Sequence, residues 1–301
     1  MITSIIFSKD RPLQLDLTLK SICKNFLAQN NISVLYKETT GYADSYKTLQ
    51  SEHPNVIFYK QGHSIFQDID RIVSQSEDKY IVFFTDDNIF YRKVLFNHDD
   101  MNLLFDEEIS CLSLRIGVNT TQRELDGVMG PDARPAEALM IIENGGEDIS
   151  SVDGYQFIAW NRTSVTLGGY WSYALSVDGH VFTKETIAPM CGELLYQSKY
   201  GERKEALKWR ETPNEFETKL QRFYFETLPF MTSPVYSCVV NSPNNRVQVS
   251  HPENLSGSVY PLVPYELNEQ FQKGKRLNLE KINFGDITCP HTEIDLLAGL
   301  E

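Results

Sequence analysis

The chain has 301 residues, of which 41% are hydrophobic and 23% are charged, a balance that excludes wholesale disorder and suits one large domain or two modest ones. Lys plus Arg number 28 and Asp plus Glu number 41, which gives a formal net charge of −13. A surface with this charge repels phosphate backbones and anionic lipids, so the composition argues against non-specific binding of nucleic acids or membranes.

The first hundred residues alternate apolar runs typical of strands with amphipathic patterns typical of helices. Strands are predicted over residues 4–8, 32–36, 56–59 and 80–84, and helices over 12–26, 42–50 and 65–73. The strand runs are apolar without interruption, which predicts a parallel sheet buried on both faces. Ligands of such sheets bind beyond the carboxyl ends of the strands, where Ser8–Pro12 and Thr85–Asn88 lie.

The rest of the chain is less regular and contains no low-complexity linker. Strands are predicted over 109–116, 138–142 and 235–241, a polar loop over 117–135, and helices over 184–200 and from Thr212 onward. Pro189 is a point where the first of these helices could kink or split. We therefore expect one compact catalytic domain over residues 1–240, with a C-terminal extension over 241–301 packed on it.

The five cysteines are scattered and none is spaced as Cys-x-x-Cys, so we expect reduced thiols and neither a disulfide framework nor a zinc site. The N-terminus lacks the pattern of a signal peptide, and the apolar runs are far shorter than the ~20 residues of a membrane span. These features predict a cytoplasmic protein with no transmembrane segment.

The sharpest motif is the pair Asp86 and Asp87, directly after the fourth predicted strand. Two adjacent carboxylates repel one another at the edge of a sheet, and a divalent cation offsets that repulsion. Mg²⁺ or Mn²⁺ held by one or two carboxylates keeps coordination sites for diphosphate oxygens. The alternative is a solvated Asp-Asp-Asn turn, because these residues also favour turns.

An α/β half that ends in a strand followed by an Asp pair resembles the GT-A fold of nucleotide-sugar glycosyltransferases. The opening Ile5–Pro12, followed by a helix, is similar to the first nucleotide-binding loop of bacterial family 2-like members. The resemblance covers residues 1–115. It implies a Rossmann-like, mostly parallel central sheet flanked by helices, with a nucleotide-sugar-binding half over 1–115 and an acceptor half over 116–240.

The resemblance also implies a divalent cofactor, Mn²⁺ or Mg²⁺, with Asp87 as a metal ligand and Asp86 at the ribose or in a supporting role. The usual Asp-x-Asp triplet is replaced here by Thr85-Asp86-Asp87 or Asp86-Asp87-Asn88, which leaves the division of these roles open. In the GT-A pattern a C-terminal histidine completes the metal shell, and His251 is the candidate; the alternative is a surface histidine.

Further contacts to the donor are expected from polar residues at the strand ends. Arg11 offers a charge-assisted fork for a diphosphate, and Ser8 and Asp10 share its loop; a surface arginine and a helix-capping aspartate are the alternatives. Lys60 is a candidate nucleobase contact, although an ordinary polar loop explains it as well. Arg246 is close enough in sequence to His251 to serve the diphosphate side.

Inverting transfer needs a general base that takes the proton of the acceptor hydroxyl. Two candidates stay open: Glu217 near the start of a predicted helix, and Asp178 in a turn. The helix dipole explains an acidic residue in a first turn equally well, and turns favour aspartate. The aromatic run Tyr170–Tyr173 is a candidate acceptor platform, or simply core.

These features favour a metal-dependent glycosyltransferase that moves a sugar from a nucleoside diphosphate to an acceptor hydroxyl. Surface glycan or lipopolysaccharide is the preferred acceptor, and a hydroxymethylated DNA base is a second one. A sugar nucleotidyltransferase is a rival, but the first loop lacks the usual glycines. A non-catalytic module that binds sugar nucleotides or glycans is another. P-loop, dinucleotide and α/β-hydrolase motifs do not occur.

Overall fold

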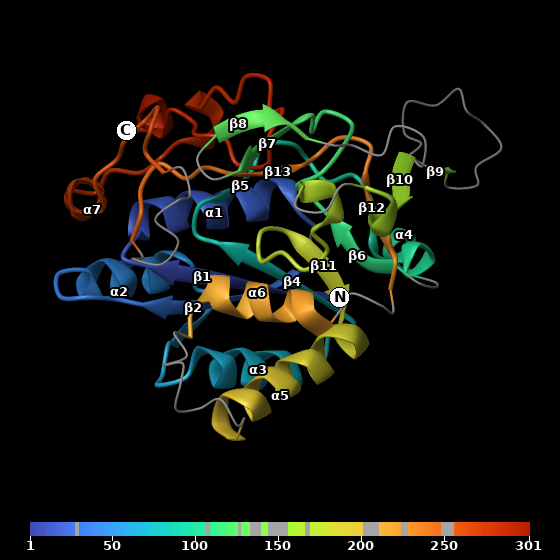
Figure 1. Ribbon diagram of the computed structural model, residues 1–301. Coiled ribbons are helices and arrows are strands. Elements are labelled where there is room, and N and C mark those ends of the chain that lie inside the picture. Colours follow the sequence, from blue (N-terminus) through green and yellow to red (C-terminus); the bar gives the residue numbers. More distant parts are fainter. Residues whose placement is uncertain are drawn as a thin grey trace.

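The computed structural model describes residues 1–27, 30–105, 109–125, 128–132, 140–143, 156–165, 169–200, 211–223, 228–247 and 256–301. Within these residues the largest sheet has nine strands (Figure 1). In spatial order they are β3 (Ile57–Lys60), β2 (Asn30–Lys37), β1 (Ile2–Lys9), β4 (Tyr80–Thr85), β11 (His180–Thr183), β6 (Ile109–Ser113), β12 (Phe230–Pro234), β10 (Gln156–Asn161) and β9 (Met140–Glu143).

Two short sheets pair β5 (Asn88–Phe90) with β13 (Val239–Asn241) and β7 (Gln122–Leu125) with β8 (Val128–Pro131). The α-helices are α1 (Pro12–Asn25), α2 (Ala43–Glu52), α3 (Ile65–Gln75), α4 (His98–Leu104), α5 (Lys184–Tyr200), α6 (Pro213–Phe223) and α7 (Pro264–Gln272). Short 3₁₀ turns lie at Arg162–Ser164, Tyr170–Ser172, Leu279–Lys281 and Leu296–Gly299.

The α/β class with a mostly parallel central sheet is confirmed. Strands β1 to β4 are mutually parallel, and only β11 and β10 run against the others among the described strands of the large sheet. Figure 1 shows α1 on one face of the sheet and α3, α5 and α6 on the other. The covered faces explain why the first strands are apolar without interruption.

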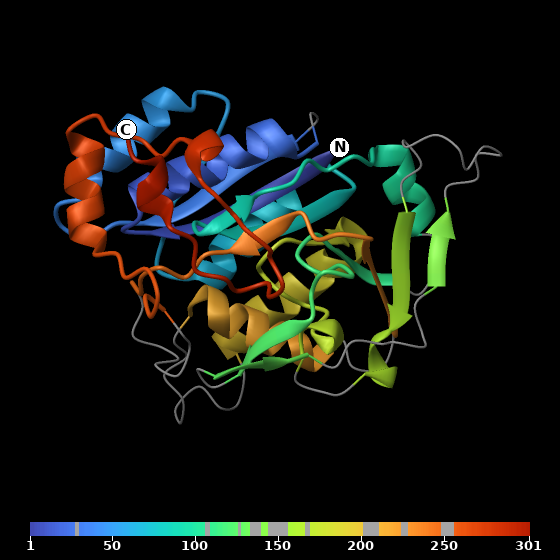
Figure 2. The ribbon, with the colours of Figure 1, turned by 90° about the horizontal axis from the view of Figure 1, so that it is seen from above.

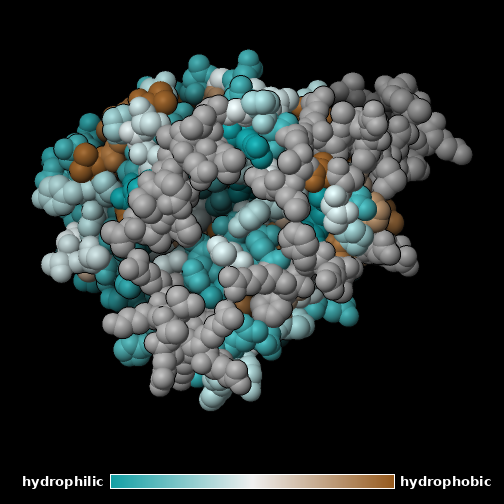
Figure 3. All heavy atoms as spheres, in the orientation of Figure 1, coloured by the Kyte–Doolittle hydropathy of each residue, from teal (hydrophilic) through white to brown (hydrophobic). Residues whose placement is uncertain are grey.

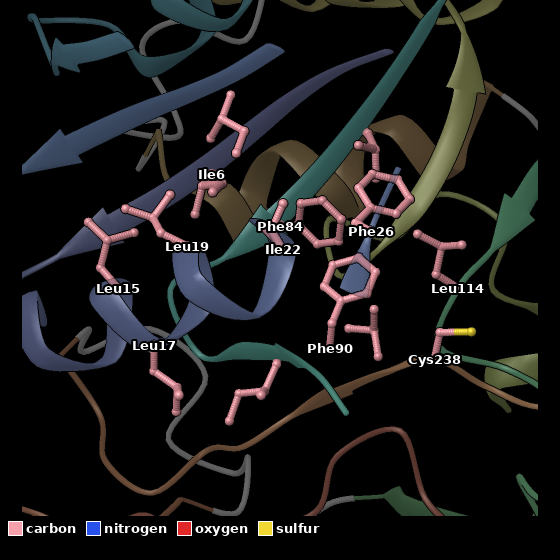
Figure 4. Close-up of a cluster of buried hydrophobic side chains, with 14 of the residues drawn as sticks. Ile6, Leu15, Leu17, Leu19, Ile22, Phe26, Phe84, Phe90, Leu114 and Cys238 are labelled. Atoms are coloured by element: carbon pink, nitrogen blue, oxygen red, sulfur yellow. The ribbon is translucent and has the colours of Figure 1, made fainter. Parts of the chain in front are cut away.

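Buried side chains form a cluster on each face of the sheet, because successive residues of a strand point to opposite faces. Ile6 and Phe84 belong to the cluster under α1, which Figure 4 shows in close-up. Their chain neighbours Ile5 and Phe83 belong to the cluster under α3, α5 and α6. Both strands are therefore fixed in register from two sides, and so are the residues at their carboxyl ends.

The antiparallel strand β11 brings a distant segment to the end of β4. Because β11 runs against β4, the residues just before it lie beside the carboxyl end of β4. Gly179 makes this turn with a φ of +78°, a conformation that favours glycine, and its N–H donates to the Phe83 carbonyl at 2.8 Å. Asp178, one residue earlier, is thereby placed next to Thr85 and Asp87.

The C-terminal residues pack against the first half of the chain. Helix α7 contacts α1 and α2, and Figure 2 shows it beside them. Asn244 Nδ2 donates to the carbonyls of Tyr260 and Ile294, at 3.1 and 2.8 Å. A bridge between Asn241 and His291 places His291 beside the end of β13. No helix in the described ranges is long and apolar enough to span a membrane.

Three local expectations differ from the structure. The strand predicted over 235–241 is confined to Val239–Asn241, and a separate strand, β12, ends at Pro234. Helix α5 runs through Pro189 without splitting. The segment expected as a loop over 117–135 contains the β7–β8 hairpin, and residues 126–127 and 133–135 lie outside the described ranges.

Candidate active site

A pocket of about 340 Å³ lies beyond the carboxyl ends of β1 and β4, where a parallel sheet places its ligands. Figure 3 shows a hollow near the centre of this face, with hydrophilic side chains around it. The β1–α1 loop, the end of β4, the turn before β11, the start of α6 and the segment after β13 all contribute to its wall. The pocket thus combines segments from the whole length of the chain.

The side chain of Arg11, from the β1–α1 loop, reaches Asp86 and Asp87. Its Nη1 donates to Asp86 Oδ1 at 2.9 Å and to Asp87 Oδ2 at 2.7 Å. Its Nε donates to Asn245 Oδ1 at 2.7 Å, and its Nη2 donates to the Asn245 carbonyl. Four of the five N–H groups of this guanidinium are therefore used within the protein, which leaves one for a ligand.

Burial and charge act against each other at this cluster. Burial alone would lower the pKa of Arg11, but the charges of Asp87 and Asp86 raise it above its ordinary value, so Arg11 stays charged. Burial raises the pKa of Asp86 to about 6, against the opposing effect of Arg11. Asp86 also accepts the Lys9 backbone N–H at 3.0 Å, so this carboxylate shapes the first loop.

Thr85, Asp87, Asp178 and Asn241 form a compact oxygen cluster. Thr85 Oγ1 lies 2.7 Å from Asp87 Oδ1 and 2.8 Å from Asp178 Oδ1. The Asn241 amide lies 3.1 Å from Thr85 Oγ1, 2.9 Å from Asp87 Oδ1 and 3.4 Å from Asp178 Oδ1. A hydroxyl has one proton, so one of the two carboxylate contacts to Thr85 lacks a hydrogen.

Two carboxylate oxygens thus share one hydroxyl proton, and we ask whether these residues fit a divalent cation. Asp87 and Asp178 turn oxygens toward one point, and a hard cation prefers such oxygens and needs only one or two carboxylates when a diphosphate supplies the rest. The described residues contain no group of three or more His, Cys, Asp or Glu arranged for a metal. The side chains therefore fit a cation shared with a ligand, and not a closed protein cage.

Asp178 is held ionised by its surroundings. Burial raises its pKa, but His291, Arg115 and Thr85 outweigh burial and bring the pKa far below its ordinary value. Arg115 Nη1 donates to Asp178 Oδ2 at 2.9 Å, and His291 Nε2 lies 3.4 Å from the same oxygen. Tyr170 lies against both partners, since its ring packs on Arg115 and its hydroxyl is 3.2 Å from His291 Nδ1.

Glu217 also lines the pocket, and its pKa is shifted in the direction opposite to that of Asp178. Burial, followed by the charge of Asp178, raises its pKa to about 7. The Val177 N–H donates to Glu217 Oε1 at 3.1 Å. Glu217 is the fifth residue of α6, and Phe216 and Leu220 of the same helix are buried against the sheet. A carboxylate that exchanges its proton near neutral pH thus lines the pocket.

Of the other residues expected at the site, two line the pocket and two do not. Ser8 and Arg246 line the pocket. Asp10 and Lys60 are not among its described lining residues: Asp10 accepts the Thr39 N–H at 2.7 Å, and Lys60 pairs with Glu38. The capping alternative for Asp10 is wrong, because Arg11 occupies the N-cap of α1 and no side chain caps it.

His251 lies outside the described residues, and the structure brings a different histidine, His291, into the pocket. Nothing in the short Cys-Pro-His-Thr context of His291 signals this, and its position depends on the bridge to Asn241. Of the aromatic run, Trp171 is buried core and its Nε1 donates to the Thr120 carbonyl at 3.3 Å. Thr85 stands where the usual Asp-x-Asp triplet has its first aspartate, and this departure is the sequence signal that could have pointed to it.

No family model and no curated protein matches the chain. Among solved structures, S. aureus TarS 1–349 is 11% identical with a TM-score of 0.41, over 78% of this chain and 58% of that chain. Glycosyltransferase GlyE of Streptococcus pneumoniae is 11% identical with a TM-score of 0.34, over 90% and 63% of the two chains. Mannosyltransferase PcManGT from Pyrobaculum calidifontis, in complex with GDP-Man and Mn²⁺, is 12% identical with a TM-score of 0.29, over 41% of each chain. At these values the likenesses carry no functional assignment.

Proposed function

We propose that the protein is a GT-A glycosyltransferase that moves a sugar from a nucleoside diphosphate to an acceptor hydroxyl with the help of a divalent cation. The observation that carries the proposal is that two different groups of residues line one pocket. One group holds Asp86 and Asp87 with a buried arginine, and the other holds Glu217 with a pKa of about 7. The first group suits a metal-bound diphosphate and the second suits proton removal.

The donor side of the pocket is built for a charged leaving group. Lys9, Arg11, Lys37 and Arg246 line it, so positive charge surrounds the place where a diphosphate would leave. Pre-placed charge of this kind stabilises the departing oxygen without reorganisation during the reaction. Because Arg11 has one N–H left, its main role in the proposal is to hold Asp86 and Asp87 in place.

Asp87 would hold the cation, and Asp178 lies on the other side of the Thr85 hydroxyl. A bound Mn²⁺ or Mg²⁺ would supply Lewis-acid stabilisation of the diphosphate oxygens. Asp86 then keeps the first loop in position through the Lys9 N–H. His291 packs beside Asp178 and helps to hold its carboxylate, with both ring nitrogens engaged by protein groups.

Glu217 is the base of the proposed mechanism. It takes the proton from the acceptor hydroxyl, the acceptor oxygen bonds to the anomeric carbon, and the bond from that carbon to the diphosphate breaks with its electrons on the leaving oxygen. A base works best when its pKa lies near the working pH, and Glu217 meets this condition. Asp178 is held ionised by Arg115 and is too weak a base at neutral pH.

The net charge of the protein bears on the choice of acceptor. A net charge of −13 suits a neutral or surface-glycan acceptor better than DNA with a hydroxymethylated base, because duplex phosphates would be repelled. A neutral surface glycan is thus the preferred acceptor in this proposal. We also propose the division into a catalytic region over 1–240 and an extension over 241–301 that completes the site.

Incubation with UDP-, GDP- and CDP-sugars and Mn²⁺ tests the function. Slow hydrolysis of one donor without an acceptor is expected, and Asp87→Asn should abolish it. Glu185→Gln, on the helix α5 surface away from the pocket, is the matched control and should retain it. Binding without turnover would favour a sugar-nucleotide-binding module, and release of pyrophosphate from a nucleoside triphosphate plus sugar phosphate would favour a nucleotidyltransferase.

A further inference from the structure

The side chain of Thr85 lies between those of Asp87 and Asp178. Its single hydroxyl proton faces Asp87 Oδ1 and Asp178 Oδ1 at nearly equal distances, 2.7 and 2.8 Å. The two N–H groups of Asn241 reach the same oxygens but cannot fill the contact that lacks a hydrogen, because that contact joins two oxygen atoms. The hydroxyl therefore serves one carboxylate at a time.

Asp178 in turn belongs to the segment that holds Glu217. Its backbone N–H donates to Ser176 Oγ at 3.2 Å, and the neighbouring Val177 N–H donates to Glu217 Oε1 at 3.1 Å. Val177 and Asp178 are consecutive residues, so the contact of Thr85 with Asp178 and the contact of Val177 with Glu217 belong to one backbone segment. A path of direct contacts thus joins Asp87, through Thr85 and Asp178, to the carboxylate of Glu217.

We infer that Thr85 is a positioning residue that passes its hydroxyl from Asp87 to Asp178 when a ligand satisfies Asp87, and so fixes Glu217 for transfer only when the donor is in place. The inference rests on the proposed function. A hydroxyl rotates about its C–O bond at little cost, so a ligand at Asp87 is enough to change its partner. Misplacement of a reacting group by about 1 Å can slow a reaction by roughly 10²-fold, so a small shift of Glu217 is sufficient.

Thr85→Val tests this role, because valine keeps the branched shape and removes the hydroxyl. We expect the kcat of transfer or donor hydrolysis to fall by about tenfold or more, with the donor KM changed by less than about threefold. Thr85→Ser restores the hydroxyl and should recover most of the kcat. A wild-type kcat in Thr85→Val, or equal losses in both variants, would overturn the inference, since the latter means that the methyl group matters.

A second readout does not depend on turnover. Asp87→Asn, Asp178→Asn and the double variant form a cycle whose non-additivity in unfolding free energy measures the coupling of the two carboxylates. Asn241 contacts both carboxylates and is retained in both backgrounds, so the change in coupling between the two backgrounds measures the share of Thr85. The coupling should fall by more than about half in the Thr85→Val background. Unchanged coupling would refute the inference even in a protein without transferase activity, whereas a wild type that turns over no donor would refute only the proposed function.

Discussion

Asp178 is buried and Glu217 half-buried, and their environments shift the pKa values of the two carboxylates in opposite directions. Arg115 and His291 hold Asp178 ionised, whereas Glu217 has no cation in hydrogen-bond contact among the described residues and takes its pKa from burial and from the charge of Asp178. When two carboxylates titrate so differently, the one with the raised pKa is the natural proton carrier. This difference is the reason why the proposal makes Glu217 the proton acceptor and gives Asp178 a charge-bearing role.

Glu217→Gln keeps the side-chain shape and removes the ability to accept a proton. Transfer should fall by about 10²–10⁴-fold while donor binding survives. In the wild type, kcat/KM should rise with pH to a plateau above about 7, because the base must be deprotonated. A pH–rate profile together with a donor-binding titration checks both.

Asp178→Asn is the companion measurement. It should weaken the apparent affinity for metal or donor. The acid limb of the pH–rate profile should remain, because Glu217 still accepts the proton. The acid limb of the profile should move slightly lower, since loss of the Asp178 charge lowers the pKa of Glu217. A profile whose acid limb disappears in Asp178→Asn would assign the base to Asp178 instead.

The raised pKa of Glu217 has a consequence for stability. The folded-state pKa of about 7 exceeds the ordinary 4.5, so folding favours the protonated form, and stability is lost as pH rises from about 4.5 through 7. Glu217→Gln should therefore raise the Tm at pH 8, by about 2 °C or more, and have little effect at pH 4.5. Thermal unfolding at the two pH values measures this; a lower Tm at pH 8 would contradict the electrostatics.

At the scale of elements, the β1–α1 loop and the segment after β13 are locked together. Arg11 joins Asp86 and Asp87 to Asn245, and Lys9 Nζ donates to the Val247 carbonyl at 2.7 Å. Antiparallel pairing of β13 with β5 sets Asn241 opposite Asn88, at the end of the same motif. The pairing of β5 with β13 thus brings a late part of the chain onto the β1–α1 loop.

Arg11→Lys keeps the positive charge and removes the planar fork. A lysine cannot reach both carboxylates and both Asn245 acceptors, so buried acceptors lose donors. We expect a loss of about 1–3 kcal/mol in unfolding free energy and a weaker affinity for nucleoside diphosphate. Denaturant unfolding and calorimetry measure the two effects; Lys24→Arg, on the exposed end of α1, is the control that should change neither.

At the scale of the whole molecule, the site is assembled from both ends of the chain. The first strand and loop supply Ser8 and Arg11, while Asn241 and His291 come from beyond residue 240. The carboxyl ends of β1 and β4 meet at one sheet edge, and both core clusters hold those strands rigid. A ligand that bridges these segments should stabilise the entire fold.

Nucleoside diphosphate with Mn²⁺ should accordingly raise the Tm. The gain follows RT ln(1 + [L]/Kd), about 2.7 kcal/mol when the free ligand is at 100 times its Kd. Chelation of the metal should remove most of the shift, because the cation supplies the positive charge that the Thr85 cluster lacks. An equal shift with and without metal would mean that Asp87 does not hold a diphosphate-bound cation.

Much of the first half could be predicted because it depends on neighbours in sequence. The apolar runs marked β1, β2, β3 and β4, and Pro12 begins α1 as its fixed φ favours. The position of Asp86 and Asp87 at a strand end followed from the same patterns. Short or irregular elements such as β5, β10 and β12 gave weak periodic signals, and their pairing partners stabilise them.

The sequence by itself determined the α/β class, the order of the first elements and the acidic motif at the sheet edge, because periodicity and turn chemistry are local. Only the tertiary structure decided which distant side chains meet there. It turned Arg11 onto Asp86 and Asp87, brought His291 to Asp178, and gave Glu217 and Asp178 opposite pKa shifts. Such contacts depend on strand register and on burial, and both are set by the packing of segments that lie as much as 234 and 238 residues apart.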